Sequence, residues 1–294
     1  MSQQLRDQLE LHFLVLLWGF TAVLGLLIEI PSVEIVFFRT LISFVVIGIG
    51  LVIAKKQLRV EPRELAKLFI VGSLFAGHWI LFFLAAKVSN ASLCLAGMAT
   101  TAIWSSFLEP LVGNKKISGL EVILSLFALA GISIVLNVEY DRALGLILAI
   151  GAALLAAIFT IANKSLVSKH EPFKIMFYEM MGAFLVTTAF LPAYKYYLTD
   201  GLLRLDPSLS DWFYLFVLSV ICTVYAYTMS VKLLKRISAF TVNFTVNLEP
   251  VYGIILAFLI LGDSERMNAG FYLGTGLILI SVIAYPFLQR KIKI

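Results

Sequence analysis

Residues Ala143–Ala162 read ALGLILAIGAALLAAIFTIA, a run of twenty positions without a charged side chain. About 20 apolar residues allow an α-helix to cross the hydrocarbon core of a bilayer. The whole chain of 294 residues shares this character, because 61% of it is hydrophobic and only 14% is charged. A soluble domain has roughly 45–50% apolar and about 25% charged residues. The composition therefore excludes most soluble, disordered, collagen-like and coiled-coil proteins, and it indicates a polytopic membrane protein.

Ten apolar stretches follow one another along the chain, each bounded by charge, Pro or Asn. They are Leu9–Ile28, Val33–Ala54, Leu65–Ala86, Ala91–Val112, Ile117–Leu136, Ala143–Ala162, Phe173–Tyr194, Asp211–Leu234, Ser238–Leu261 and Ala269–Leu288. Because lipid offers the backbone no hydrogen-bond partners, we expect each stretch to form a helix. The first is not expected to be a cleaved signal, since its leader is mixed in charge. The predicted fold is all-α, with ten transmembrane helices and no second folded domain.

The basic residues predict the orientation of these helices, and an even number of spans places both termini on one side. Of the 23 Lys and Arg residues, Arg39 lies inside a span and 17 lie on the side of the termini. The other side has five: Lys87, Arg142, Lys195, Arg204 and Arg266. Basic connections concentrate on the cytoplasmic face of a membrane. Both termini are therefore predicted to be cytoplasmic.

Short similarities between the two halves suggest an internal repeat. Val88–Ala91, which opens the fourth span, resembles Ile237–Phe240, which opens the ninth, and Val36–Arg39 resembles Met176–Glu179. We predict two five-helix repeats, 1–138 and 143–294, which lie in opposite orientations because five is odd. Inverted repeats recur in secondary transporters, with the substrate site between the halves near the midplane. The alternative is that apolar helices resemble one another through composition alone.

Several motifs connect the chain to a known family. They are Trp18-Gly19-Phe20, Phe37-Phe38-Arg39, His78-Trp79, Leu248-Glu249-Pro250 and Leu261-Gly262-Asp263. In this order they resemble the EamA family of the drug/metabolite transporter superfamily over essentially the whole chain. That family usually has Gly-Glu after spans four and nine, whereas Asn114 and Asp263 stand here in place of the Glu.

The resemblance implies a ten-helix carrier in the cytoplasmic (inner) membrane of a prokaryote. Such a carrier moves small metabolites, often outward, by alternating access. Amino acids or related amphipathic compounds are the substrates that the resemblance favours. It also implies that spans one, three, four, six, eight and nine surround the cavity.

Polar residues in the ninth span form the first candidate site. Inserting a charged side chain at the bilayer centre costs at least ~2.5 kcal/mol of free energy, so we expect Glu249 to have a specific role there. It lies ~16 Å into its span at 1.5 Å per residue, beside Pro250, which removes a backbone donor. Asn243 and Asn247 precede it on one helical face. We predict a proton or substrate site here; the alternative is a glutamate that bonds neighbouring helices and fixes their packing.

Arg39 and Glu179 occupy matching repeat positions, each ~9 Å below a surface. Because the repeats are inverted, Arg39 lies below the outer surface and Glu179 below the cytoplasmic surface. The hydrocarbon core is ~30 Å thick, so the two charges are separated by roughly 12 Å in depth. We therefore predict no direct salt bridge between them. Arg39 either extends to the outer interface or serves in gating or carboxylate recognition. His78 is either a satisfied core histidine or a proton carrier.

Aromatic residues complete the candidate set. Trp18, Trp79, Trp104 and Tyr227 lie deep in their spans, where Tyr and Trp seek partners for O–H and N–H. We expect these four side chains to line a cavity for amphipathic or aromatic solutes. The alternative is that they only pack against neighbouring helices.

The sequence lacks the motifs of other chemistries. It has no H-E-x-x-H, no Walker loop and no C-x-x-C, and Cys94 and Cys222 stand apart. We therefore expect no enzyme, no cofactor and no nucleic-acid partner. The prediction is a secondary transporter that exports small metabolites, with protons as a possible coupling ion and the bilayer as its environment. The alternatives are an uncoupled facilitator or channel and an intramembrane enzyme, and a monomer or a homodimer is equally compatible.

Overall fold

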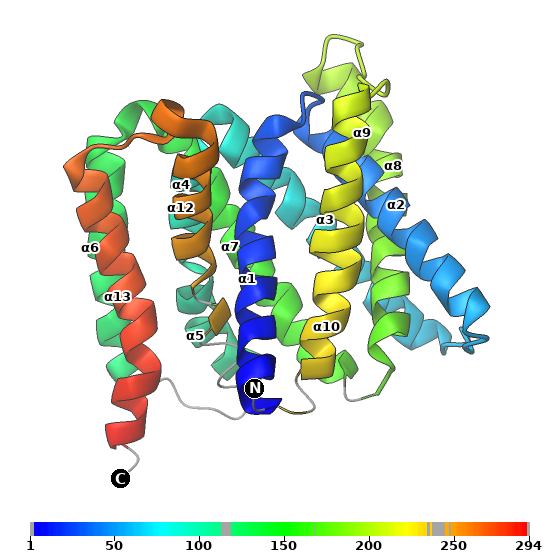
Figure 1. Cartoon of the computed structure of the whole chain (residues 1–294), viewed down its shortest axis with the longest axis horizontal. Coiled ribbons are helices and arrows are strands. Elements are labelled where there is room, and N and C mark those ends of the chain that lie inside the picture. The colour runs from blue at the N-terminus through cyan, green and yellow to red at the C-terminus, as the bar shows by residue number, and fades with distance from the viewer. Residues whose placement is uncertain are drawn as a thin grey trace.

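The computed structural model describes residues 3–112, 119–167, 169–233, 236, 245–246 and 248–292. Within these ranges all regular structure is helical, and helical residues occur in each of the ten expected spans. The α-helices are α1 (Gln3–Leu27), α2 (Ser32–Ile53), α3 (Pro62–Val88), α4 (Ala91–Met98), α5 (Thr101–Val112), α6 (Gly119–Val138), α7 (Ala143–Val167), α8 (Pro172–Leu198), α9 (Leu209–Phe216), α10 (Ala226–Leu233), α12 (Glu249–Leu261) and α13 (Ala269–Ile292). Helix α1 begins and α13 ends at the same end of the bundle (Figure 1).

Six of the described helical segments are long and apolar enough to cross a membrane. They are Leu5–Leu27, Ser32–Ile53, Pro62–Val88, Tyr140–Val167, Pro172–Leu198 and Leu209–Ser230. Three shorter apolar segments accompany them: Ala91–Ser105, Ile123–Val138 and Ala269–Ser281. The predicted all-helical membrane architecture is therefore confirmed, and the number of ten spans stays a prediction.

The fourth expected span consists of two helices, α4 and α5. The backbone N–H of Thr100 donates to the Gly97 carbonyl, three residues back, at 3.1 Å, so the last turn of α4 tightens. The hydroxyl groups of Thr100 and Thr101 also donate to backbone carbonyls three residues back, both at 2.7 Å. Local polar side chains thus compete with the helical ladder at this point.

The eighth expected span is continuous but not uniform. Between α9 and α10 lies η2 (Val217–Tyr225), which is a π-helix of nine residues. The Thr223 hydroxyl donates to the Leu218 carbonyl, five residues back, at 2.8 Å. π-Helical segments are rare and occur frequently at functional sites.

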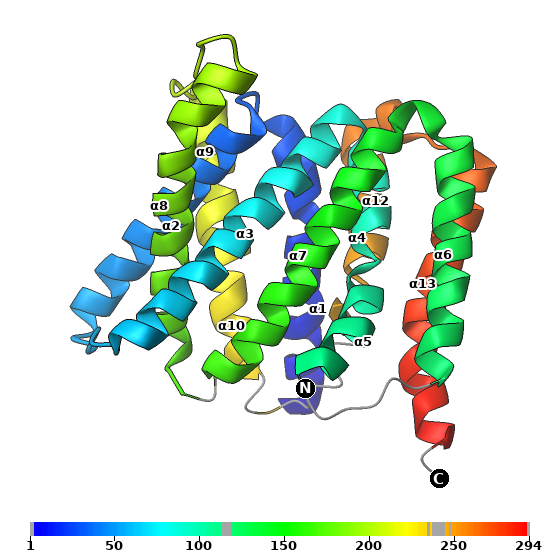
Figure 2. The ribbon, with the colours of Figure 1, turned by 180° about the vertical axis from the view of Figure 1, so that it is seen from behind.

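The two halves of the chain interlock. Helix α1 packs against α12, and in the same manner α7 packs against α4 and α5, while α3 lies against both α7 and α8. Helices α6 and α13 form a pair at one side of the bundle (Figure 2). Glycine allows the closest crossings: a Cβ atom at Gly19 of α1 would stand 2.8 Å from the backbone nitrogen of Gly253 of α12.

Candidate functional site

Arg39 of α2 is buried between the two halves, with 3% of its surface exposed. Its Nε donates to Oγ1 of Thr223 in the π-helix at 3.0 Å. The guanidinium carbon lies 3.8 Å above the ring centroid of Trp79 on α3, a cation–π geometry. No described residue accepts a hydrogen bond from the two terminal nitrogens. The arginine is thus oriented on two sides, and its forked end is left for another acceptor.

Glu179 of α8 is more deeply buried, at 1% exposure, and neither of its carboxylate oxygens has a hydrogen-bond partner. Asn163 of α7 is a polar neighbour of Glu179, and its amide oxygen is likewise buried without a hydrogen-bond donor. Tyr227 of α10 lies within electrostatic range of Glu179. The Glu179 backbone packs directly against Gly72 of α3, which leaves no room for a side chain at that position. A buried charge without a partner is costly, so this carboxylate requires an explanation.

Among the described contacts, Arg39 and Glu179 do not form a salt bridge with each other. They nevertheless belong to one cluster, because Thr223 and Tyr227 are four residues apart on the same helical segment. We call Arg39, Trp79, Thr223, Tyr227 and Glu179 the inter-half cluster, since the first two come from one half of the chain and the other three from the second.

His78 borders this cluster, and its ring is satisfied. Its Nδ1 donates to the Ala152 carbonyl of α7 at 2.9 Å. Its ring meets the Phe159 ring edge-on, with centroids 5.4 Å apart. This geometry agrees with the interpretation of His78 as a core histidine.

Glu249 lies elsewhere, as the first residue of α12, where it is partly exposed. Its backbone carbonyl packs closely against Gly19 of α1. Among the described residues, its carboxylate has no hydrogen-bond or ion-pair partner. Asn243 and Asn247, predicted to share its site, lie outside the described residues.

The remaining predicted aromatics do not join the inter-half cluster. Trp18 of α1 packs beside a separate apolar group that includes Leu14 and Ala226. Trp104 lies on α5, and its indole N–H is buried without a partner. Trp79 and Tyr227 are thus the two predicted aromatics that the structure brings to buried charges.

Polar contacts link neighbouring segments at both ends of the bundle that holds the cluster. At the end where α1 begins, Glu64 of α3 lies 2.7 Å from Lys67 and 3.6 Å from both Lys169 and His170. At the opposite end, Asp211 accepts a hydrogen bond from the Glu29 backbone N–H at 2.7 Å. There Lys87 donates to the Ile28 and Ile30 carbonyls at 2.6 and 2.9 Å.

Glu265 shows how a buried carboxylate is satisfied in this fold. It is 2% exposed and accepts hydrogen bonds from the backbone N–H groups of Ala91 and Ser92 at 3.0 and 2.8 Å. These are unpaired donors at the start of α4, where a negative charge is favourable. Glu265 therefore has a structural role as the cap of α4.

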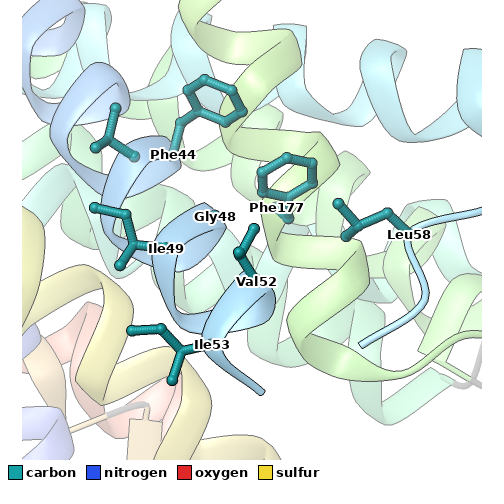
Figure 3. Close-up of a pocket in the computed structure, with 8 residues that line it drawn as sticks. Phe44, Gly48, Ile49, Val52, Ile53, Leu58 and Phe177 are labelled. Carbon is teal, nitrogen blue, oxygen red and sulfur yellow. The ribbon is translucent and has the colours of Figure 1, made fainter. Parts of the chain in front are cut away.

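One open groove lies apart from all these charges, on the outer side of α2. It has a volume of about 400 Å³ and is lined only by apolar residues and Gly48. Figure 3 shows Phe44, Gly48 and Val52 of α2, Phe177 of α8 and Leu58 of the connection after α2 around it. This groove was not predicted, because its residues are ordinary members of apolar stretches.

Metal ligands do not gather in the part of the chain that the structure describes: it holds no group of three His, Cys, Asp or Glu that could bind an ion. Cys94 and Cys222 are buried and free.

Comparisons with known proteins place the chain among transporters. The model of the EamA-like transporter family matches residues 11–137 and 143–285. A protein of Archaeoglobus fulgidus named as an uncharacterized transporter is 21% identical over 286 residues, which cover 95% of this chain and 98% of that protein. A protein solved by crystallography, 14% identical, aligns with a TM-score of 0.66 over 97% of this chain and 99% of its own. That last likeness concerns the fold alone.

Proposed function

The chain belongs to the EamA-like transporter family, and from this premise we propose that it exports small metabolites by alternating access, as a secondary transporter. Membership of the family and a relative named as a transporter support transport rather than catalysis. The residues of the inter-half cluster supply what such a carrier needs, which is a polar site formed by both halves.

One observation carries the proposal: two oppositely charged side chains are buried within the helices and do not neutralise each other. Among the described residues, no acceptor bonds the two terminal nitrogens of Arg39, and no donor bonds either oxygen of Glu179. Ionisable groups inside membrane helices face substrate or ion pathways far more often than they serve packing. A ligand whose anionic and cationic ends span the depth between the two groups would satisfy both.

This chemistry favours amino acids or closely related compounds as substrates. A carboxylate matches the fork of Arg39 in a bidentate geometry, and the Trp79 ring holds the guanidinium plane in place. An ammonium group would pair with Glu179, with Tyr227 beside it. We propose this as the binding arrangement of the exported substrate.

The membrane arrangement that we propose has ten helices in two inverted fives, with both termini in the cytoplasm of a prokaryote. The reciprocal packing of α1 on α12 and of α7 on α4 and α5 supports an approximate two-fold relation between the halves. The polar contacts at the two ends of the bundle would then open in alternation.

Glu249 is our candidate for ion coupling, together with Asn243 and Asn247. Its carboxylate at the start of α12, which has no partner among the described residues, supports a site that takes up a proton or contacts substrate. Replacement by Gln, which cannot release a proton, should then abolish transport driven by a pH gradient and leave exchange of substrate intact.

The test is counterflow in liposomes that contain the purified protein. Amino acids and their amphipathic derivatives are screened with and without a pH gradient, using Glu249→Gln and, as a control, Glu171→Gln, whose side chain is exposed. Saturable counterflow supports a carrier, and uphill uptake with a pH gradient supports coupling. Unsaturable flux without counterflow would instead establish an uncoupled facilitator or channel, and product formation without a gradient would establish an enzyme.

A further inference from the structure

The apolar groove between α2 and α8 has no place in the proposed transport cycle. We propose that it binds one acyl chain of an anionic phospholipid, whose headgroup lies on the basic residues beside the end of the groove where α2 ends. This inference goes beyond the proposed function and needs only that the protein lies in a membrane.

Gly48 lets the Phe177 ring approach α2 closely and form part of the groove. A Cβ atom at Gly48 would lie 3.1 Å from Cε2 of Phe177, so a larger side chain there would press on this ring and change the groove. Phe44 and Phe177 form the inner wall, with ring centroids 5.1 Å apart. Val52, at 70% exposure, faces outward along the opening. In a bilayer such a recess must be filled, because an empty apolar gap forfeits dispersion contacts on one side.

Two hydrogen bonds from α8 hold the connection that closes the groove. The Tyr178 hydroxyl donates to the Leu58 carbonyl, and Nζ of Lys174 donates to the Arg59 carbonyl at 3.5 Å. Leu58 is thereby held as the end wall of the groove. The recess is therefore bounded on the side where α2 ends.

Positive charge gathers at this same end. Lys55, Lys56 and Arg59 follow α2 and are exposed, and Lys174 lies one helical turn before Phe177. Lys56 pairs with Glu171 at 3.2 Å, whereas the side chains of Lys55, Arg59 and Lys174 have no acidic partner among the described residues. An apolar recess that ends in free cations is complementary to a molecule with a hydrocarbon tail and an anionic head. Basic residues at a membrane surface attract anionic lipids by about 1 kcal/mol each.

Native mass spectrometry of the purified full-length protein tests the proposal, with phosphatidylglycerol compared against phosphatidylcholine of identical chains. We expect phosphatidylglycerol to form a saturable adduct and phosphatidylcholine to bind at least about fivefold more weakly. Gly48→Leu should weaken phosphatidylglycerol binding about tenfold, because its side chain would displace the Phe177 ring and take up apolar surface of the groove. Gly50→Leu is the matched control, because a Cβ atom there meets nothing within 4 Å.

A second pair of variants tests the headgroup independently of the recess. Lys174→Gln should weaken phosphatidylglycerol binding about fivefold, and Lys195→Gln, exposed near the other end of α8, should not change it. Equal binding of the two lipids, or equal effects of the two glycine variants, would overturn the proposal. So would dimerisation that Gly48→Leu abolishes without loss of lipid, because a second copy would then occupy the groove. If Gly48→Leu fails to fold, the lipid comparison and the lysine pair decide alone.

Discussion

Arg39 and Glu179, which the sequence predicts to occupy matching repeat positions, have different surroundings. Arg39 has a hydroxyl partner on the π-helix and an aromatic ring beneath its guanidinium group. Glu179 is buried still more completely and has no donor at either oxygen. Glu265 in the same molecule shows that the fold can supply two backbone donors to a buried carboxylate. From this difference we propose that Glu179 serves substrate binding rather than stability, and that its partner is the substrate.

Exchanging the two charges should have the largest effect. The double variant Arg39→Glu, Glu179→Arg should abolish counterflow as fully as either single change. The two side chains do not pair, and each exchanged charge would be buried without a group that stabilises it. The measurement is substrate exchange in liposomes at matched protein content. Recovery of exchange in the double variant would show that the two residues form a pair during transport.

Glu179→Gln should lower the apparent substrate affinity about 100-fold, since removing one partner of a buried charge pair costs 2–5 kcal/mol or more. The unfolding temperature should not fall, because the native chain gives this carboxylate no hydrogen bond to lose. Thermal unfolding in detergent and counterflow are measured on the same preparation, with exposed Glu171→Gln as the control. Loss of stability together with transport would identify Glu179 as a packing residue.

Arg39→Lys should weaken apparent substrate affinity about tenfold, because a lysine keeps the charge but loses the bidentate fork and the planar contact with Trp79. Arg266→Lys, at an exposed ion pair, is the matched control. The concentration dependence of counterflow measures the change. An unchanged affinity would mean that any positive charge suffices and that the guanidinium geometry has no role.

The smallest effect should come from Thr223→Val, which removes the hydroxyl that orients Arg39 and preserves the volume. A single hydrogen bond contributes about 1 kcal/mol, so affinity should fall roughly fivefold. Thr188→Val on α8 removes a similar hydroxyl-to-carbonyl bond at an exposed place and should leave transport unchanged. If the two variants behave alike, Thr223 does not position Arg39.

Much of the helical architecture could be predicted because long apolar runs in lipid have few structural options. Arg39 and Glu179 were found for the same reason, since a charge inside such a run stands out. Thr223 and Asn163 were missed, because Thr and Asn are unremarkable in a helix and their positions depend on packing between distant segments. The π-helix at Val217–Tyr225 and the break between α4 and α5 contain no Pro, and the Thr residues in both are too common in helices to mark them. Asn243 and Asn247, which the sequence placed with Glu249, stay a prediction.

The most direct test of the account pairs each buried charge with the substrate group that it is proposed to bind. Counterflow inhibition is measured with an amino acid, its decarboxylated amine and its deaminated acid, on the wild type, Arg39→Gln and Glu179→Gln. We predict that Arg39→Gln removes the advantage of the amino acid over the amine, and that Glu179→Gln removes its advantage over the acid. If both variants weaken all three compounds by the same factor, the charges do not contact the ligand, and the central claim is contradicted.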